Sequence, residues 1–255
     1  MMKKIKNLRF FLNSFIIFLL HLPFVFAKSV GNTLKNGYES NKILITSTNS
    51  IVNHTALSPL MSTVFDSLRL DMIGLSRNVF EMAIKGLQKL KKSGMVVTDN
   101  IISIADFSQP SNHKRLYVID LNNISLLFQT YVAHGQNSGR EYAQRFSNRP
   151  HSFQSSPGFY VTMNPYLGSN GYSLKLNGVE RGINNNALRR DIVIHGAAYV
   201  NEELIQEQGY IGRSWGCPAV PLGLHYKLIE TIKNGTCLFI YPGKSSYFKN
   251  STILK

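Results

Sequence analysis

Acidic residues and cysteines are scarce in this 255-residue chain, which has 14 Asp and Glu against 28 Lys and Arg, and only 2 cysteines. The resulting net charge of +14 favours a polyanion or an acidic surface as partner. The sequence has no nucleic-acid motif and no paired Cys or His spacing of the kind that binds zinc, so we expect no nucleic acid, metal or cofactor. A chain of this length can build a core without disulfides.

The first 27 residues are predicted to be a signal peptide. Basic residues at Lys3, Lys4, Lys6 and Arg9 precede an apolar run over 10–26, and Ala27 ends it as a small residue at a cleavage site. Removing four positive charges lowers the net charge from +14 to +10. The alternative is an uncleaved membrane anchor, the only link to a membrane that we expect. Either way the protein is predicted to be exported, to a periplasm or cell envelope.

The rest of the chain divides by composition. Residues 28–56 are polar and predicted to be a flexible lead-in, and 57–94 form a helical accessory segment whose second helix is capped by Ser76 and stopped at Gly94. We expect its apolar stripe to pack on the core, with a dedicated binding role as the alternative. Residues 95–243 form the catalytic domain, and 244–255 a polar tail.

The pattern of the catalytic domain is mostly that of short strands. Asn122-Asn123 and Asn177-Gly178 are typical hairpin turns, and a helix is expected at 222–233. The expected strands lie at 101–107, 115–121, 124–133, 158–163, 172–176 and 236–241. This order predicts a mainly β barrel or sandwich with an N-terminal helical segment, α+β overall.

A histidine and a cysteine stand where they can share a site. His195 closes the apolar run 191–194, a predicted buried strand, and Cys217 follows a glycine-rich loop 22 residues later. A cysteine attacks acyl groups as its thiolate, so an imidazole nearby can accept its proton. A disulfide between Cys217 and Cys237 is an alternative, although a buried free thiol at Cys237 is favoured because it lies in an apolar strand.

These residues resemble the murein L,D-transpeptidases (YkuD-like catalytic domains), in a divergent branch with the motif GRSWGCPAV at 212–220. The resemblance rests on His195-Gly196 followed by Ser214-Trp215-Gly216-Cys217, and on the upstream segments 132–139 and 155–160. Trp215 stands where many members have a second histidine, and Ala219 where many have arginine or asparagine. Papain-like enzymes place the cysteine before the histidine, so the order here disfavours them.

The resemblance implies a role for each matching residue. Cys217 is the expected nucleophile, His195 the base, Gly196 the residue whose carbonyl orients the imidazole, and Ser214 a hydroxyl that hydrogen-bonds within the site. Backbone N–H groups around Trp215, Gly216 and Cys217 are expected to form the oxyanion hole. The residues expected to bind substrate are His134, Gly135, Ser138, Arg140 and Arg213. His134 is also the rival base, and a zinc site of Cys217, His195 and His134 stays open as an alternative.

By the same resemblance the protein is an exported peptidoglycan L,D-transpeptidase. It is expected to form an acyl-enzyme with a tetrapeptide stem and to transfer the acyl group to an amine of another stem or of a wall-anchored protein. The alternatives are an L,D-carboxypeptidase, in which water resolves the acyl-enzyme and D-alanine is released, and a non-catalytic cell-wall-binding module.

Overall fold

The computed structural model describes residues 59–255, so the predicted signal peptide (1–27) and lead-in (28–56) lie outside the described residues. The helices are α1 (Pro59–Ser67), α2 (Arg77–Lys92), α3 (Glu202–Gln208), α4 (His225–Ile232) and α5 (Ser245–Asn250), with a short 3-10 helix, η1, at Leu188–Arg190. The strands are β1 (Ile101–Asp106), β2 (Leu116–Asp120), β3 (Ser125–Thr130), β4 (Gly158–Gly168), β5 (Gly171–Gly178), β6 (Val193–Ala197), β7 (Ala219–Pro221) and β8 (Cys237–Tyr241).

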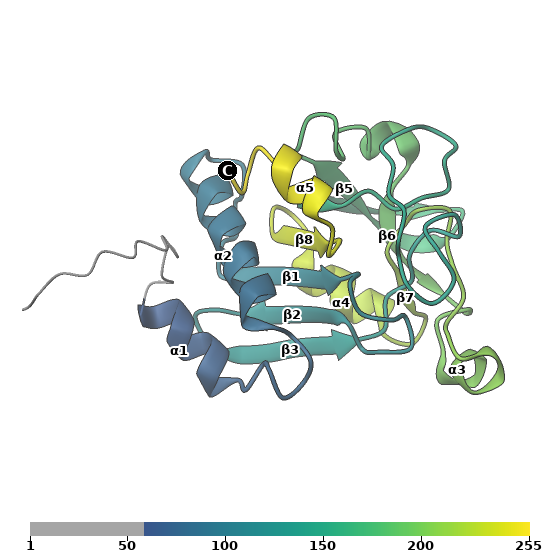
Figure 1. Cartoon of the computed structure of the whole chain (residues 1–255), viewed down its shortest axis with the longest axis horizontal. Helices are drawn as coiled ribbons and strands as arrows, with labels where there is room; N and C mark the ends of the chain where they lie inside the picture. Colours follow the sequence, from purple (N-terminus) through teal and green to yellow (C-terminus); the bar gives the residue numbers. More distant parts are fainter. Residues whose placement is uncertain (1–58) are drawn as a thin grey trace, which may run out of the picture. The chain divides into compact units, whose positions relative to one another are not determined.

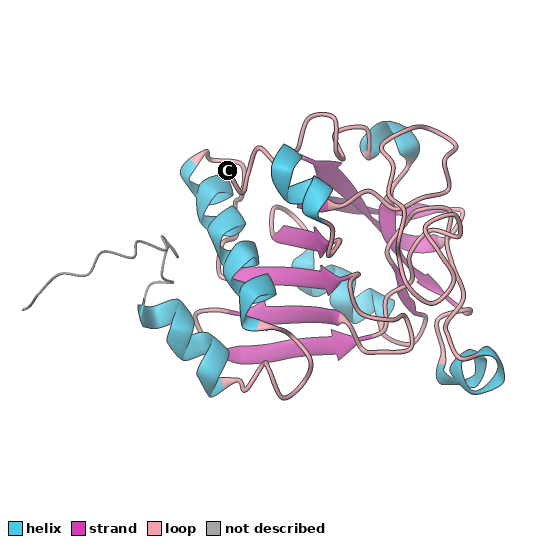
Figure 2. Cartoon of the chain, in the orientation of Figure 1, coloured by secondary structure: helices cyan, strands magenta, loops and turns pink. Residues whose placement is uncertain are grey.

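The strands form one sheet in the order β3-β2-β1-β8-β4-β5-β6-β7. The pairs β1·β8 and β6·β7 are parallel and the others antiparallel. The chain that leaves β3 reaches the far edge through an isolated bridge between Ala133 and Ala219, which brings the two ends of the sheet together as in a barrel (Figures 1 and 2). The mainly β fold with an N-terminal helical segment is therefore confirmed.

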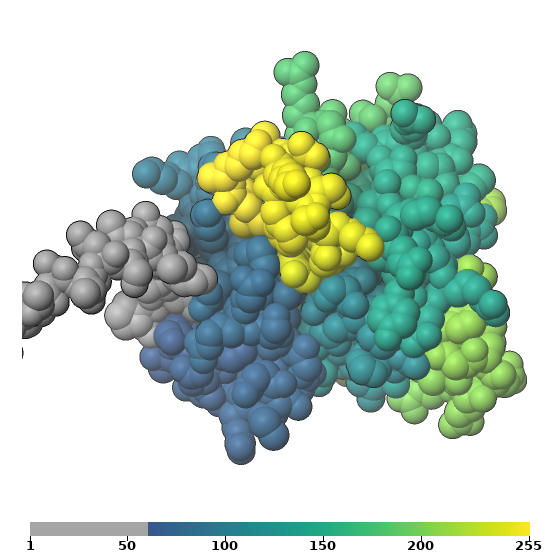
Figure 3. All heavy atoms as spheres, viewed as in Figure 1, coloured from purple at the N-terminus to yellow at the C-terminus, as the bar shows by residue number. Residues whose placement is uncertain are grey.

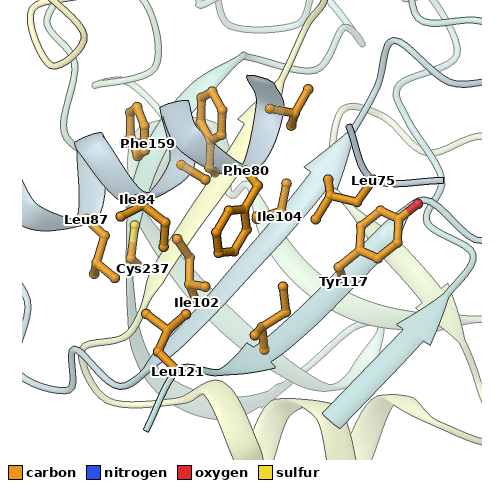
Figure 4. Packing of buried hydrophobic residues seen from close by; sticks show 14 of the residues in the cluster. Leu75, Phe80, Ile84, Leu87, Ile102, Ile104, Tyr117, Leu121, Phe159 and Cys237 are labelled. Atoms are coloured by element: carbon orange, nitrogen blue, oxygen red, sulfur yellow. The ribbon is translucent and has the colours of Figure 1, made fainter. Parts of the chain in front are cut away.

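Helix α2 forms where its capping residue and apolar spacing predict it. The Ser76 hydroxyl accepts the Val79 N–H at 3.3 Å, which satisfies an orphan donor of the first turn. The apolar stripe from Val79 to Leu90 is buried against Ile102, Phe159 and other residues of β1, β4 and β8 (Figure 4). The helix thus packs on the main core, as its apolar stripe predicts.

The two faces of the sheet carry separate cores. Helices α2 and α5 cover one face over β1, β8 and β4. Helix α4 packs on the other face with Leu228, Ile229 and Ile232, against residues that include Leu174 and Ile194. Side chains alternate along a strand, so the neighbours of Leu174 in β5 and of Ile194 in β6 project to the opposite face, the one that α2 and α5 cover over β1, β8 and β4. That face of β5 to β7 is where the functional side chains described below are found.

One predicted hairpin is confirmed and one is wrong. Asn122 and Asn123 lie in the turn between β2 and β3, where both N–H groups donate to the Asp120 carboxylate at 3.0 Å. Asn177 and Gly178 instead end β5. A Cβ at Gly178 would lie 2.0 Å from the Asn184 carbonyl oxygen, so glycine is needed there for a close backbone approach.

The predicted polar tail at 244–255 is also corrected, because it packs as α5 and a final turn. Tyr247 and Ile253 are buried, and Ser251 is fully buried. Glu180, also fully buried, accepts the Phe159 N–H at 2.8 Å, the Tyr247 hydroxyl at 2.9 Å and the Ser251 hydroxyl. Figure 3 shows this segment in yellow against the rest of the surface. One buried carboxyl group therefore joins the C-terminal segment to β4.

We expect Glu180→Ala to lower the free energy of unfolding by about 3 kcal/mol, because three buried donors lose their acceptor. Urea unfolding followed by circular dichroism measures this loss. Glu207→Ala, which removes an exposed carboxylate of α3, is the matched control and should change stability by less than about 0.5 kcal/mol. Equal midpoints for the two variants would contradict the role given to Glu180.

Candidate active site

The strand register brings the segments of His195 and Cys217 together. His195 pairs with Ala219 in the parallel β6·β7 ladder, and Cys217 lies two residues before Ala219. The intervening loop leaves the sheet, forms α3 and returns beside β6, as its length predicts. One detail differs, because β6 does not end at His195 but runs to Ala197.

His195 is oriented for proton transfer. Its Nδ1 lies 3.0 Å from the Gly196 carbonyl oxygen, which can only accept, so Nδ1 carries the proton and Nε2 keeps its lone pair. Burial lowers the pKa of His195 from 6.5, the carbonyl of Gly196 opposes this shift, and His225 adds to it. The imidazole is therefore a neutral base at pH 7, with its tautomer set by the next residue.

Gly196 is required for a second reason. A Cβ at this position would lie 2.7 Å from Cγ of His225, the first residue of α4. The His225 ring is itself held by a 2.6 Å contact between its Nδ1 and the Leu222 carbonyl oxygen. Any larger residue at 196 must displace this ring, which lies close to the base.

The Cys217 thiol is protonated in the resting site. Its Sγ donates to the Asp191 carbonyl oxygen at 3.5 Å, and among the described residues no hydrogen bond joins it to His195. Burial raises the pKa of Cys217 above 9.0, and Asp191 adds to this, whereas the Val193 N–H and Arg190 lower it. The nucleophile therefore needs a base, and catalytic hydrogen bonds of this kind often form only with substrate bound.

The turn before Cys217 is held by Ser214. The Ser214 hydroxyl donates to the Cys217 carbonyl oxygen at 2.6 Å and accepts the Gly216 N–H at 3.0 Å. Gly216 has φ 126°, and a Cβ there would meet the Gln154 carbonyl oxygen at 2.8 Å. The Gly216 N–H is thus already bonded, whereas among residues 59–255 no hydrogen bond uses the N–H groups of Trp215 or Cys217. The oxyanion hole stays a prediction.

Arg190 is a site residue that sequence reasoning missed. Its guanidinium donates to the carbonyl oxygens of Ser147 at 2.8 Å and Gln154 at 2.7 Å, and to the hydroxyls of Ser152 and Ser156. It thereby fastens the loop 147–156 beside Gly216 and lowers the pKa of Cys217. Arg190 directly precedes the run 191–194 that leads to His195, and this position in the sequence could have indicated that it lies near the site.

Three residues predicted to bind substrate are buried instead. His134 is fully buried, with Nδ1 2.8 Å from Nη2 of Arg115 and Nε2 3.3 Å from the Gly139 carbonyl oxygen. Burial, assisted by Arg115, lowers the pKa of His134 to about 3. Since Arg115 can only donate, both imidazole nitrogens are occupied and His134 is not a free base.

Gly135 and Ser138 support the wall of the site from within. Ser138 is fully buried and its hydroxyl accepts the Ser155 N–H at 2.9 Å. A Cβ at Gly135 would lie 2.5 Å from the Phe153 carbonyl oxygen. The Ser155 hydroxyl then donates to the Gly216 carbonyl oxygen at 3.1 Å. Both residues are buried and shape the loop behind the nucleophile, and their expected role as substrate contacts stays a prediction.

Arg140 and Arg213 gather around a tyrosine. Their guanidinium carbons lie 5.4 Å and 5.7 Å from the Tyr210 ring centroid, and Arg213 also donates to the Gly139 carbonyl oxygen at 3.2 Å. Trp215 is 72% exposed and packs against Phe153 with ring centroids 5.5 Å apart. The two arginines and this indole remain available to a substrate.

The described residues also bear on the disulfide and zinc alternatives. Both cysteines are free, and Cys237 is buried in β8, as expected. No group of three His, Cys, Asp or Glu side chains within 59–255 is placed to hold a metal, and His134, one of the three residues of the zinc alternative, has both ring nitrogens hydrogen-bonded. No helix in this part is long and apolar enough to cross a membrane.

A cleft of about 560 Å³, lined by residues that include Tyr131, Ala197 and Leu222, lies between β3 and β7.

The protonation of Cys217 can be measured directly. We expect its alkylation by iodoacetamide to rise with pH to a midpoint above 9, because burial raises the thiol pKa and the thiolate is the reacting form. Arg190→Met should move the midpoint higher, since a positive charge is lost. Intact mass reports the labelling, and Cys217→Ala controls for Cys237. A midpoint near 7 would contradict the resting state described above.

A comparison with protein-family models matches residues 72–241 to the L,D-transpeptidase catalytic domain, two thirds of the chain and a span that includes α2. No curated protein matches the sequence. Solved structures with some likeness include an L,D-transpeptidase from Mycobacterium smegmatis (12% identity, 55% of this chain and 58% of that one, TM-score 0.33) and one from Stackebrandtia nassauensis (16%, 63% and 67%, 0.33).

A variant of a helical cell shape determining protein from Campylobacter jejuni is also similar, at 14% identity over 65% of this chain and 56% of that one, with TM-score 0.37. The chain thus spans less than two thirds of two of these three proteins. Structural similarities with TM-scores this low carry no argument about function. The family match covers the strands and loops that hold His195, Ser214 and Cys217. The chain belongs to the L,D-transpeptidase catalytic domain family.

Proposed function

We propose that the protein is an exported peptidoglycan L,D-transpeptidase with Cys217 as nucleophile and His195 as base. The observation that carries the proposal is the 3.0 Å contact between Nδ1 of His195 and the Gly196 carbonyl oxygen, which places the ring proton on Nδ1 and leaves Nε2 free to take a proton. The imidazole of His195 is neutral, the thiol of Cys217 is protonated, and the β6·β7 pairing brings their segments side by side. A general-base mechanism starts from this state.

The reaction follows from these groups. Nε2 of His195 takes the thiol proton as Sγ bonds to the carbonyl carbon of the third stem residue, and the N–H groups of Trp215 and Cys217 stabilise the oxyanion. The carbon–nitrogen bond to the terminal D-alanine then breaks, and its nitrogen takes the proton from His195. An amine of a neighbouring stem, or of a wall-anchored protein, attacks the thioester and gives its proton to His195, which returns it to the departing sulfur.

Export and substrate are part of the same proposal. A basic protein that leaves the cell through residues 1–27 meets the carboxylates of stem peptides in the cell envelope. Ser214 and Arg190 act as positioning residues, because they hold the turn and the loop around the sulfur without being the reacting groups.

Intact-mass spectrometry of residues 28–255 with disaccharide-tetrapeptide, with and without an acceptor stem, tests this function. We expect a thioester adduct on Cys217 with loss of D-alanine, then a dimer linked between the third residues. An adduct that yields only tripeptide would indicate the carboxypeptidase. The absence of any adduct under reducing conditions would favour a binding module.

A further inference from the structure

An exposed tryptophan lies just before the nucleophile. Trp215 is 72% exposed, although it sits in the turn that the Ser214 hydroxyl closes onto the Cys217 carbonyl oxygen. Its indole packs on the ring of Phe153, with ring centroids 5.5 Å apart and the ring planes inclined by 57°. A large apolar side chain that is fixed in place yet left in water is typical of a surface that binds a ligand.

The loop that carries Phe153 holds this ring in a strained position. Phe153 has φ 52°, in the left-handed region that bulky residues seldom enter. Arg190 clamps the residues on both sides, because it donates to the Ser152 hydroxyl at 3.1 Å and to the Gln154 carbonyl oxygen at 2.7 Å. The Phe153 carbonyl oxygen accepts the Asn137 N–H at 3.0 Å. Strain that neighbours enforce in this way is found at ligand-binding sites, and here it fixes the support of the indole.

Positive charge borders the two rings. Segment 136–139 runs beside them, since its N–H groups donate to the carbonyl oxygens of Phe153 and Ser214. Arg145 and Arg213 each donate to a carbonyl oxygen of this segment at 3.2 Å. Among the described residues neither guanidinium forms an ion pair. Both therefore remain able to attract a ligand that carries carboxylates.

We propose that Trp215 and Phe153 form a platform on which a sugar ring of the wall glycan stacks while Cys217 acts on the attached stem. The proposal rests on the proposed function and adds the glycan to the substrate that this site recognises. The face of an indole is electron-rich, and one face of a pyranose ring presents mostly C–H groups, which are weakly positive. The two faces can stack while the sugar hydroxyls stay in water.

The length of a stem agrees with this placement. When its third residue is on Sγ of Cys217, two more residues separate that position from the sugar, and two extended residues span at most about 7 Å. Trp215 precedes Cys217 by two residues, so their α-carbons are also at most about 7 Å apart. The indole extends further from the backbone, which places the platform within reach of the first sugar.

Tryptophan fluorescence tests the platform directly, because Trp215 is the single tryptophan of the chain. The Cys217→Ala form of residues 28–255, which cannot turn the substrate over, is titrated with disaccharide-tetrapeptide, with tetra-N-acetylchitotetraose and with the free tetrapeptide. We expect both sugar-bearing ligands to shift the indole emission to shorter wavelength, since a stacked sugar displaces water. The free tetrapeptide should need at least about 10-fold higher concentration than the disaccharide-tetrapeptide for half-saturation.

Variants with Cys217 intact test the same contact through acylation. For each protein we compare the half-saturating concentrations of free tetrapeptide and disaccharide-tetrapeptide, so that a general loss of rate cancels. The wild-type ratio of about 10 should fall to about 1 in Trp215→Ala and stay high in Trp215→Phe, which keeps a ring. Tyr226→Ala, which removes an exposed ring of α4, is the matched control and should keep the wild-type ratio.

The outcomes separate the platform from the reaction. If neither sugar-bearing ligand shifts the emission, or if Trp215→Ala keeps the wild-type ratio, the platform is wrong while thioester formation on Cys217 still supports the transpeptidase. An emission shift by both sugar-bearing ligands without any thioester in the wild type would support the platform and count against the proposed function. A shift with single-stranded oligothymidylate but not with the glycans would overturn the platform in favour of nucleic acid.

Discussion

Replacing Cys217 by alanine will abolish thioester formation with the disaccharide-tetrapeptide and leave the fold unchanged. The side chain of Cys217 is partly exposed and donates one hydrogen bond, at 3.5 Å, so its loss removes little packing. Without the sulfur no acyl-enzyme can form, and residual turnover should fall by at least about 10³-fold. Intact mass and product analysis of both proteins under reducing conditions measure the change.

The matched control is Cys237→Ala, which removes the other thiol. Cys237 is fully buried among apolar residues of the α2 face, so this variant should lose stability but still form the adduct when folded. An adduct on the Cys217→Ala protein would show that another group is the nucleophile, and the assignment would then be wrong.

The second large effect is expected for His195→Gln, which should slow acylation by about 10²- to 10⁴-fold. The resting thiol has a raised pKa, so little thiolate exists at pH 7 and removal of the base is not compensated. In the wild type, acylation should fall only below pH 6.5, because the pKa of His195 is lowered and the imidazole stays neutral down to that range. Single-turnover mass spectrometry across pH measures both effects.

His134→Gln distinguishes the two candidate bases. His134 is buried between Arg115 and the Gly139 carbonyl, so we expect this variant to unfold at a lower urea concentration, by about 2 kcal/mol, with near-normal acylation per folded molecule. His113→Gln, at an exposed position, serves as the neutral control. If His134→Gln lost acylation while His195→Gln kept it, the two roles would have to be exchanged.

Several features could be predicted because they depend on residues close in sequence. The Ser76 cap and the apolar stripe of α2 follow from helical spacing, and most strands from runs of β-branched and apolar residues. His195 and Cys217 were identified by their order and their glycine-rich surroundings. The Gly196 carbonyl contact was implied by the family resemblance and is present at 3.0 Å.

Other features were decided by contacts between residues far apart in sequence. A polar-looking tail became a packed helix because Glu180, about seventy residues earlier, supplies a buried acceptor for Tyr247 and Ser251. His134 was predicted to bind substrate, but it is buried with its Nδ1 against the guanidinium of Arg115. Neither partner is visible to a local pattern, since burial and hydrogen bonding are set by the tertiary fold.

The sequence by itself determined the family, the mainly β class, and the nucleophile and base that we propose. Only the tertiary structure decided which backbone donors remain free near Cys217 and which arginine holds the loop behind it. The physical reason is that chemistry resides in residue types and their order, whereas the availability of a proton, an N–H or a charge depends on every neighbour that the fold brings within hydrogen-bonding distance.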